Sequence, residues 1–146
     1  MSVVVVDTGP LVALLDRSDS GHEWAVEVFK SLRPPLLTCE AVLAEVWHLL
    51  AESGPSRGAL AQLHASGVVR VAFDFETEAA AIWRLLEKYA DVPMDYADAC
   101  VVRMAELHRK PQVWTMDADF RIYRRNSRQT NPAALARALT PTRRRR

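Results

Sequence analysis

Short apolar runs alternate with longer stretches of helical periodicity along most of the chain. Val3–Val6 is a continuous β-branched run, which is typical of a strand buried on both faces of a parallel sheet. Short runs of similar character predict three further strands, over 36–38, 68–73 and 112–115. Between them, apolar residues recur at three- and four-residue spacing, which predicts helices over 11–15, 22–32, 40–51, 56–64, 77–89 and 95–108.

Helix-breaking residues separate these segments, at Pro34-Pro35, Gly54-Pro55, Gly67 and Pro93. Thr8 and Ser56 are candidate N-caps for the helices that follow them. Near the end of the chain, apolar and polar residues alternate over 120–124, which predicts an edge strand. The spacing of apolar residues over 131–139 predicts a last helix. Strands that alternate with helices imply right-handed βαβ crossovers. The fold class is therefore α/β, with a short, mostly parallel central sheet flanked by helices.

The length and composition fit one soluble domain. The chain has 146 residues and a mass of 16.4 kDa, with 49% hydrophobic and 25% charged residues. A chain of this size buries about 70% of its unfolded surface, so it needs no disulfide or structural metal to hold a core. The two cysteines, Cys39 and Cys100, have no metal-binding spacing. With no apolar run near membrane-spanning length and no basic, signal-like opening, we expect a cytoplasmic protein that makes no membrane contact.

The net charge of +1 conceals a strong asymmetry along the chain. Residues 1–120 contain 18 acids and 10 Lys or Arg, whereas residues 121–146 contain nine Arg and no acid. This division predicts a basic segment that meets a polyanion or folds over the acidic body, with a solubilising tail as the alternative. We expect one domain over 1–140, and we interpret 141–146 as a basic, disordered tail.

Four acids stand where an open α/β sheet binds its ligands, outside the carboxyl ends of the strands. Asp7 follows the first strand directly, and Asp117 follows the strand at 112–115. Asp98 lies at the start of the helix that precedes that strand. Glu45 interrupts the most apolar helix of the chain, so a solvated helix face alone does not explain it.

Each acid also has a purely structural interpretation. Asp7 could accept amide hydrogen bonds from the turn at Gly9, and Glu45 could pair with His48 or lie on a wet helix edge. Asp95 is best interpreted as an N-cap, with Asp98 complementing the helix dipole three residues on. Either Asp117 or Asp119 could cap the turn that leads into Phe120. Taken singly, these interpretations equal or outweigh a role in catalysis.

Together, the acids favour a metal site. Several carboxylates at one sheet edge repel one another, and a divalent cation offsets that repulsion. Oxygen ligands with no accompanying cysteine or histidine cluster favour Mg²⁺ or Mn²⁺. Such a site suits hydrolysis of a phosphodiester bond.

These segments resemble the PIN-domain ribonucleases, in particular the VapC toxins of bacterial toxin–antitoxin pairs. The resemblance covers residues 3–123 and rests on the apolar strand with Asp7-Thr8-Gly9-Pro10, Glu45 in an apolar helix, Pro93–Ala99, and Thr115–Phe120. It implies a PIN-like three-layer sandwich that cuts RNA with Mg²⁺ or Mn²⁺ and leaves a 5′-phosphate and a 3′-hydroxyl. It also implies a homodimer that a cognate VapB-type antitoxin neutralises.

The resemblance assigns roles to particular residues. The four catalytic acids would be Asp7, Glu45, Asp98 and Asp117, of which Asp7, Asp98 and Asp117 would hold the metal. Thr8, Asp95, Thr115 and Asp119 would be accessory residues. Phosphates also need positive neighbours, and Arg121, Arg124, Arg125 and Arg128 are the candidates to hold the RNA backbone. A basic face that pairs with the acidic body is the equal alternative for these arginines.

Three other classes of protein share part of this pattern. Asp7-Thr8-Gly9 after an apolar strand also occurs in retroviral-type aspartic proteases, but those are almost entirely β. An aspartyl-phosphate phosphatase would need a second Asp at position 9, where this chain has Gly9. A catalytically inactive PIN-fold module that binds RNA or a partner remains the alternative function, and the presence of all four acids disfavours it.

Overall fold

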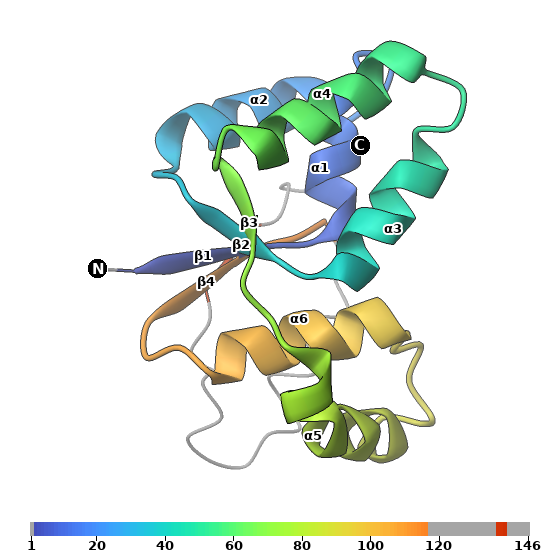
Figure 1. Cartoon of the computed structure of the whole chain (residues 1–146), viewed down its shortest axis with the longest axis vertical. Helices are drawn as coiled ribbons and strands as arrows, with labels where there is room; N and C mark the ends of the chain where they lie inside the picture. Colours follow the sequence, from blue (N-terminus) through green and yellow to red (C-terminus); the bar gives the residue numbers. More distant parts are fainter. Residues whose placement is uncertain (1, 117–136, 140–146) are drawn as a thin grey trace, which may run out of the picture.

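A computed structural model of the chain describes residues 2–116 and 137–139, and its strands form one parallel sheet (Figure 1). The described strands are β1 (Val3–Val6), β2 (Leu36–Thr38), β3 (Val69–Val71), β4 (Pro111–Trp114) and β5 (Arg137–Leu139). Their order in the sheet is β3-β2-β1-β4-β5, and every neighbouring pair is parallel. Because all strands run the same way, their carboxyl ends meet at one side of the sheet, called here the carboxyl edge.

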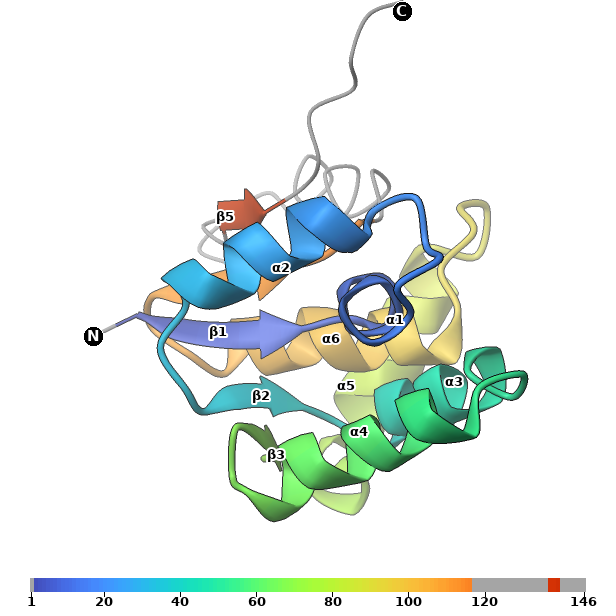
Figure 2. The ribbon, with the colours of Figure 1, turned by 90° about the horizontal axis from the view of Figure 1, so that it is seen from above.

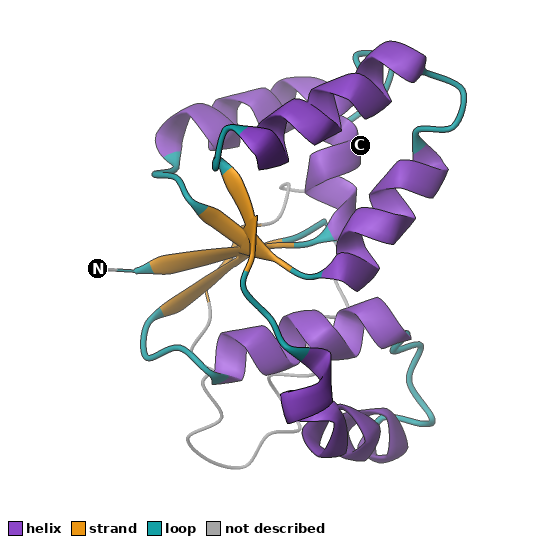
Figure 3. Cartoon of the chain, in the orientation of Figure 1, coloured by secondary structure: helices purple, strands orange, loops and turns teal. Residues whose placement is uncertain are grey.

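Helices cover both faces of this sheet (Figure 3). They are α1 (Thr8–Leu15), α2 (His22–Ser31), α3 (Glu40–Leu49), α4 (Gly54–Ala65), α5 (Phe75–Lys88) and α6 (Tyr96–Glu106). Figure 1 shows α1, α2 and α4 above the sheet and α5 and α6 below it. Seen from above, α1 continues from the carboxyl end of β1 (Figure 2). The predicted three-layer α/β sandwich is therefore confirmed.

The core lies between the sheet and the helix layers. Fully buried side chains include Val5 and Val6 of β1, Leu11 of α1, and Val113 and Trp114 of β4. The continuous apolar run of β1 is explained by its central place in the sheet, between β2 and β4, with helices on both faces. None of the helices in the described part of the chain has the length and apolar character that crossing a bilayer requires.

Two predicted helix starts were wrong by a few residues. Asp7, not Thr8, is the N-cap of α1, because its carboxylate accepts a hydrogen bond from the Thr8 amide at 2.8 Å. Ser53, not Ser56, caps α4, and the Ser56 hydroxyl instead donates to the Leu15 carbonyl of α1 at 2.8 Å. In both cases an oxygen further upstream reaches the free amides, so the helix begins earlier. Gly67 follows α4 with a φ of +80°, as its predicted place after a helix requires.

The prediction of a helix over 131–139 was also wrong at 137–139, the part of this range that the structure describes. Residues 137–139 form β5, whose backbone pairs with β4 in the register Gln112 to Arg137 and Trp114 to Leu139. A segment as short as Arg137–Leu139 fits a helix or a strand equally well, and here the edge of β4 provides the hydrogen-bond partners. The predicted edge strand over 120–124 lies outside the described residues.

Candidate active site

Asp7 stands at the carboxyl edge, in the one-residue junction between β1 and α1. Its amide donates to the Trp114 carbonyl at 2.9 Å, which continues the pairing of β1 with β4. Its carboxylate accepts from the Thr8 amide at one oxygen. The residue is only 9% exposed, so its charge lies close to the protein interior. One oxygen of Asp7 thus accepts an amide hydrogen bond, but from Thr8 as the cap of α1 and not from a turn at Gly9. The second oxygen has another partner.

That partner is Thr115, the residue directly after β4. The Thr115 hydroxyl donates to Asp7 Oδ2 at 3.0 Å, and the Thr115 side chain is completely buried. The register that places Val6 opposite Trp114 puts the next residue of each strand side by side. The pairing of two parallel strands therefore joins residues 108 positions apart in the sequence.

Glu45 belongs to the same cluster through Thr8. The Thr8 hydroxyl donates to Glu45 Oε2 at 2.8 Å, and the Thr8 side chain is buried. Glu45 is half-buried near the middle of α3, which packs against α1. A pair with His48 does not explain Glu45, because its carboxylate faces Thr8 at the carboxyl edge. Asp7, Thr8, Glu45 and Thr115 thus form one hydrogen-bonded group, called here the Asp7 cluster.

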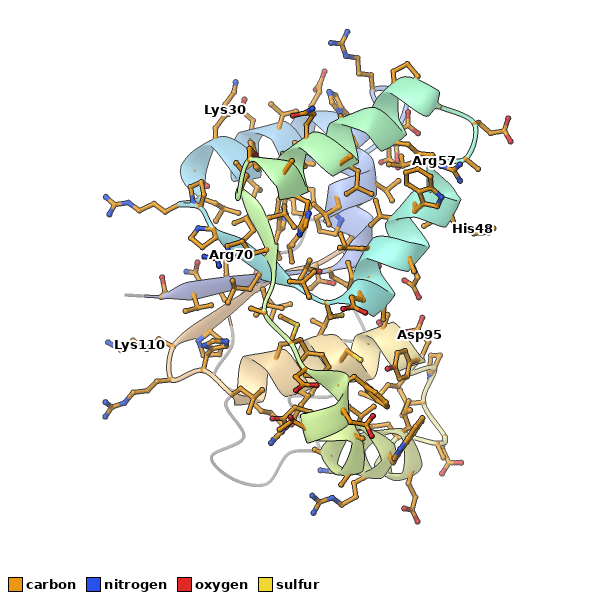
Figure 4. The ribbon with its side chains drawn as sticks, viewed as in Figure 1. Lys30, His48, Arg57, Arg70, Asp95 and Lys110 are labelled. Carbon is orange, nitrogen blue, oxygen red and sulfur yellow. The ribbon has the colours of Figure 1, made fainter. Side chains whose placement is uncertain are left out.

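Asp95 and Asp98 form a capping box at the start of α6. The Asp98 amide donates to Asp95 Oδ1 at 2.8 Å, and the Asp95 amide donates to Asp98 Oδ2 at 3.0 Å. Asp95 is exposed at the amino end of α6 (Figure 4), whereas Asp98 is half-buried. The predicted cap at Asp95 is confirmed. The helix α6 packs against both β1 and α3, the two elements that lead to Asp7 and carry Glu45.

The remaining predicted site residues lie outside the described part of the chain. They are Asp117, Asp119, Arg121, Arg124, Arg125 and Arg128. Within residues 2–116 and 137–139, no three histidine, cysteine, aspartate or glutamate side chains lie together in a way that could hold a metal ion. The described residues therefore supply part of the predicted acidic set. Threonine hydroxyls hold Asp7 and Glu45, and a backbone amide of the capping box holds Asp98.

Two supporting contacts escaped the sequence analysis. Thr38 at the end of β2 is completely buried, and its hydroxyl donates to the Val6 carbonyl at 3.1 Å, just before Asp7. Gly9 lies so close to Met116 that an added Cβ would stand 3.2 Å from the Met116 Cβ. A glycine at position 9 lets the chain after β4 pass close to the first turn of α1. A polar residue at a strand end was the only signal for Thr38, and nothing local marks the contact of Gly9.

The comparisons with known proteins agree with this architecture. The family model of the PIN domain matches residues 4–126. The chain therefore belongs to the PIN domain family, as the sequence predicted. Among individual relatives, it is similar to Ribonuclease VapC26 of Mycobacterium tuberculosis, with 28% identity over 116 residues that cover 78% of this chain and 86% of the relative.

A solved structure agrees as well. The crystal structure of Mycobacterium tuberculosis VapC20, described as a toxin that cleaves the sarcin–ricin loop, superposes on this chain with a TM-score of 0.69 and 26% identity. The superposition covers 82% of this chain and 94% of that structure. The predicted resemblance to VapC-type members of the family is thus confirmed by both sequence and structure.

Proposed function

We propose that this chain is an endoribonuclease that hydrolyses RNA phosphodiester bonds with the help of Mg²⁺ or Mn²⁺, and that it is the toxin of a VapBC-type toxin–antitoxin pair. The Asp7 cluster carries this proposal. It gathers two carboxylates and two hydroxyls from β1, α1, α3 and the end of β4 at the carboxyl edge, where α/β folds bind their ligands. The names of the two relatives, a ribonuclease and an RNA-cleaving toxin, support the same activity.

The donor chemistry of the site fits a hard divalent cation. The candidate ligands are Asp7, Asp98 and Asp117, which offer only carboxylate oxygens, directly or through water. A bound cation would lower the pKa of a water molecule and neutralise charge on the phosphate. Asp7 can hold a cation only in one orientation, because the Thr8 amide and the Thr115 hydroxyl fix its carboxylate.

Glu45 has a different role in this proposal. The hydroxyl of Thr8 fixes one of its oxygens, which leaves the other to orient and deprotonate the attacking water or to hold a second cation. Attack on phosphorus would leave a 5′-phosphate and a 3′-hydroxyl. The candidate contacts to the RNA backbone are Arg121, Arg124, Arg125 and Arg128, with Asp119 and Asp95 as accessory acids.

The biological setting belongs to the same proposal. We propose a cytoplasmic homodimer that a VapB-type antitoxin neutralises, by analogy with the VapC relatives. Both cysteines are free thiols, which is consistent with a reducing compartment.

Metal dependence gives the direct test of the activity. The purified protein, incubated with total RNA or tRNA, is expected to cleave the RNA in Mg²⁺ or Mn²⁺ and to lose that activity in EDTA. Activity should return when either cation is added in excess of the chelator. EDTA that is already saturated with Mg²⁺ serves as the matched control. Unchanged cleavage in EDTA would contradict the metal site, and no cleavage under any condition would favour the inactive RNA- or partner-binding module.

Substitution of Glu45 tests its proposed role as the base that deprotonates the attacking water. Glu45→Gln keeps an oxygen that accepts from Thr8 and removes the negative charge and the base. We expect the cleavage rate to fall by about 10²–10⁴, the usual contribution of a general base, with an unchanged melting temperature. Glu52→Gln, the same exchange at an exposed position after α3, should cleave at the wild-type rate. Equal rates for the two variants would remove Glu45 from the mechanism.

A further inference from the structure

Positive side chains gather where the strands begin, at the end of the sheet away from the Asp7 cluster. The connection from α2 to β2 carries Arg33, and the connection from α6 to β4 carries His108, Arg109 and Lys110. Because β2 and β4 are the two neighbours of β1, these connections stand on either side of the first residues of β1. Figure 4 shows Lys110 on the opposite side of the molecule from Asp95. The side of the sheet where the strands begin is called here the amino edge.

No acid balances these cations locally. The connections and strand starts at the amino edge contain no aspartate or glutamate over 2–3, 31–35, 66–68 and 107–110. Arg33, Arg109 and Lys110 are exposed, and none of the three forms an ion pair within the described part of the chain. The amino edge therefore presents three full positive charges to solvent.

The acids of the carboxyl edge lie too far away to cancel these charges. The four residues of β1 span about 13 Å, which exceeds the screening length of about 8–10 Å at physiological ionic strength. The 11 residues of α6, about 17 Å long, likewise separate the capping box from Arg109 and Lys110. The two ends of the sheet thus carry separate fields of opposite sign.

The amino edge is hollowed as well as positive. One hollow, of about 830 Å³, is lined by Arg33 and Gln112 together with apolar residues of β1 and β2. A second hollow, of about 630 Å³, is lined by Arg109 and Lys110. Val3 lines both, so the two hollows adjoin and are called here the amino-edge groove. Cations spread along a groove suit an extended polyanion better than a single small anion.

We propose that the amino-edge groove binds the phosphate backbone of RNA, as a second contact surface outside the candidate active site. The inference rests on the proposed function, because it takes RNA as the polyanion. The carboxyl edge holds the acids of the site and repels phosphate groups, so part of the affinity for RNA has to come from cations elsewhere. Arginine and lysine side chains on phosphates supply affinity that depends on salt and not on base sequence.

The separation of the two edges has a consequence for the substrate. An RNA that is cut beside Asp7 reaches the amino-edge groove only if it extends at least about 13 Å beyond the cleavage point, the length of β1. A short oligonucleotide can occupy the candidate active site alone. The groove therefore acts on long RNA and leaves the cleavage of short RNA unchanged.

Binding to tRNA in EDTA measures this contact without metal-dependent cleavage. Fluorescently labelled tRNA is titrated over a range of salt concentrations with the wild-type protein and with the triple variant Arg33→Gln/Arg109→Gln/Lys110→Gln. Three lost phosphate contacts should reduce the slope of log K against log salt by about 2–3, and the affinity at 0.1 M salt should fall about ten- to a hundredfold. Electrophoresis of the recovered tRNA checks that it stays intact.

The matched control removes the same net charge from exposed positions on other elements. The variant Arg17→Gln/Arg84→Gln/Lys88→Gln changes the turn after α1 and the exposed side of α5. It should bind tRNA with nearly the wild-type affinity and salt slope. Thermal unfolding of both triple variants verifies that each keeps the fold.

Lysine modification locates the contact in the wild-type protein. Lys110 and Lys88 are both exposed, so both react with an acetylating reagent in the free protein. We expect tRNA in EDTA to protect Lys110 several-fold and to leave Lys88 unchanged, as measured by mass spectrometry of the peptides. This result does not depend on the folding of any variant.

Cleavage separates the groove from the chemistry of the site. With tRNA and Mg²⁺, the triple variant at the amino edge should have a raised KM and an unchanged kcat, because the exchanged residues lie outside the Asp7 cluster. A short oligonucleotide taken from the cleaved region should be cut equally well by the variant and the wild type. If the wild type binds tRNA through the groove but cuts no RNA, the proposed nuclease function fails and the binding surface stands.

Three results would overturn the proposal. The first is a triple variant at the amino edge whose affinity and salt slope equal those of the wild type, with Lys110 unprotected. The second is an equal loss of affinity in the control variant, which would assign the effect to net charge alone. The third is displacement of tRNA from the groove by polyglutamate at the same concentration of charge, which would favour an acidic protein as the partner.

Discussion

Replacing Asp7 with asparagine is expected to abolish RNA cleavage and to leave the fold intact. Asparagine retains a side-chain oxygen that can accept from the Thr8 amide, so α1 keeps its cap. The side-chain amide can face Thr115, since a hydroxyl accepts as well as donates hydrogen bonds. What is lost is the negative charge at the centre of the site. We expect the cleavage rate in saturating Mg²⁺ to fall at least about a hundredfold, because loss of a residue that only supports a metal ligand already costs about 10–100-fold and Asp7 is a ligand itself.

The matched control is Asp91→Asn, the same exchange at an exposed position in the turn after α5. It should cleave RNA at the wild-type rate and melt at the same temperature. Circular dichroism and thermal unfolding of both variants separate a loss of chemistry from a loss of structure. An Asp7→Asn protein that cleaves RNA as fast as the wild type would refute the assignment of the site.

The largest effect on stability is expected from Trp114→Ala. Trp114 is completely buried in β4, and its ring lies 6.1 Å from Trp24 and 6.5 Å from Phe29, centroid to centroid. Removing the indole leaves a cavity between the sheet and α2, which should lower the free energy of unfolding by about 3–5 kcal/mol. Because a domain has only about 5–15 kcal/mol of stability, much of the variant should unfold in mild urea.

Trp83→Ala is the matched control for this prediction. Trp83 is 55% exposed on α5, where its ring contacts Phe75 at 5.8 Å and Tyr96 at 6.3 Å. Its removal should lower the free energy of unfolding by only about 1 kcal/mol. Urea unfolding followed by circular dichroism measures both changes. Equal losses for the two tryptophans would contradict the described core.

Local patterns predicted most of the fold. Val3–Val6 is a buried strand because its β-branched run fits the centre of a parallel sheet, and Asp95 caps α6 because its oxygen reaches amides only three residues away. Interactions of this range depend on neighbouring residues in the sequence, so the sequence shows them directly. The predictions failed at Thr8 and Ser56, where two neighbouring side-chain oxygens compete to cap the same helix. They also failed at 137–139, where pairing with the edge of the sheet decides whether a short segment is helix or strand.

The candidate site was predicted by its residue types and not by its contacts. The acid in the apolar helix, Glu45, was a sound candidate, but its hydrogen bond to Thr8 spans 37 positions and depends on how α3 packs against α1. The contact between Asp7 and Thr115 likewise depends on the register of β1 and β4. Whether Asp117 joins these residues stays a prediction.

The sequence by itself determined the order of strands and helices from β1 to β4, the family, and which acids follow the strands. Only the tertiary structure decided that Thr115 holds Asp7, that Thr8 holds Glu45, and that Thr38 donates to the Val6 carbonyl. The physical reason is the range of the interactions. Caps and apolar periodicity act within a few residues, whereas these three contacts exist only after parallel strands have paired and helices have packed on them.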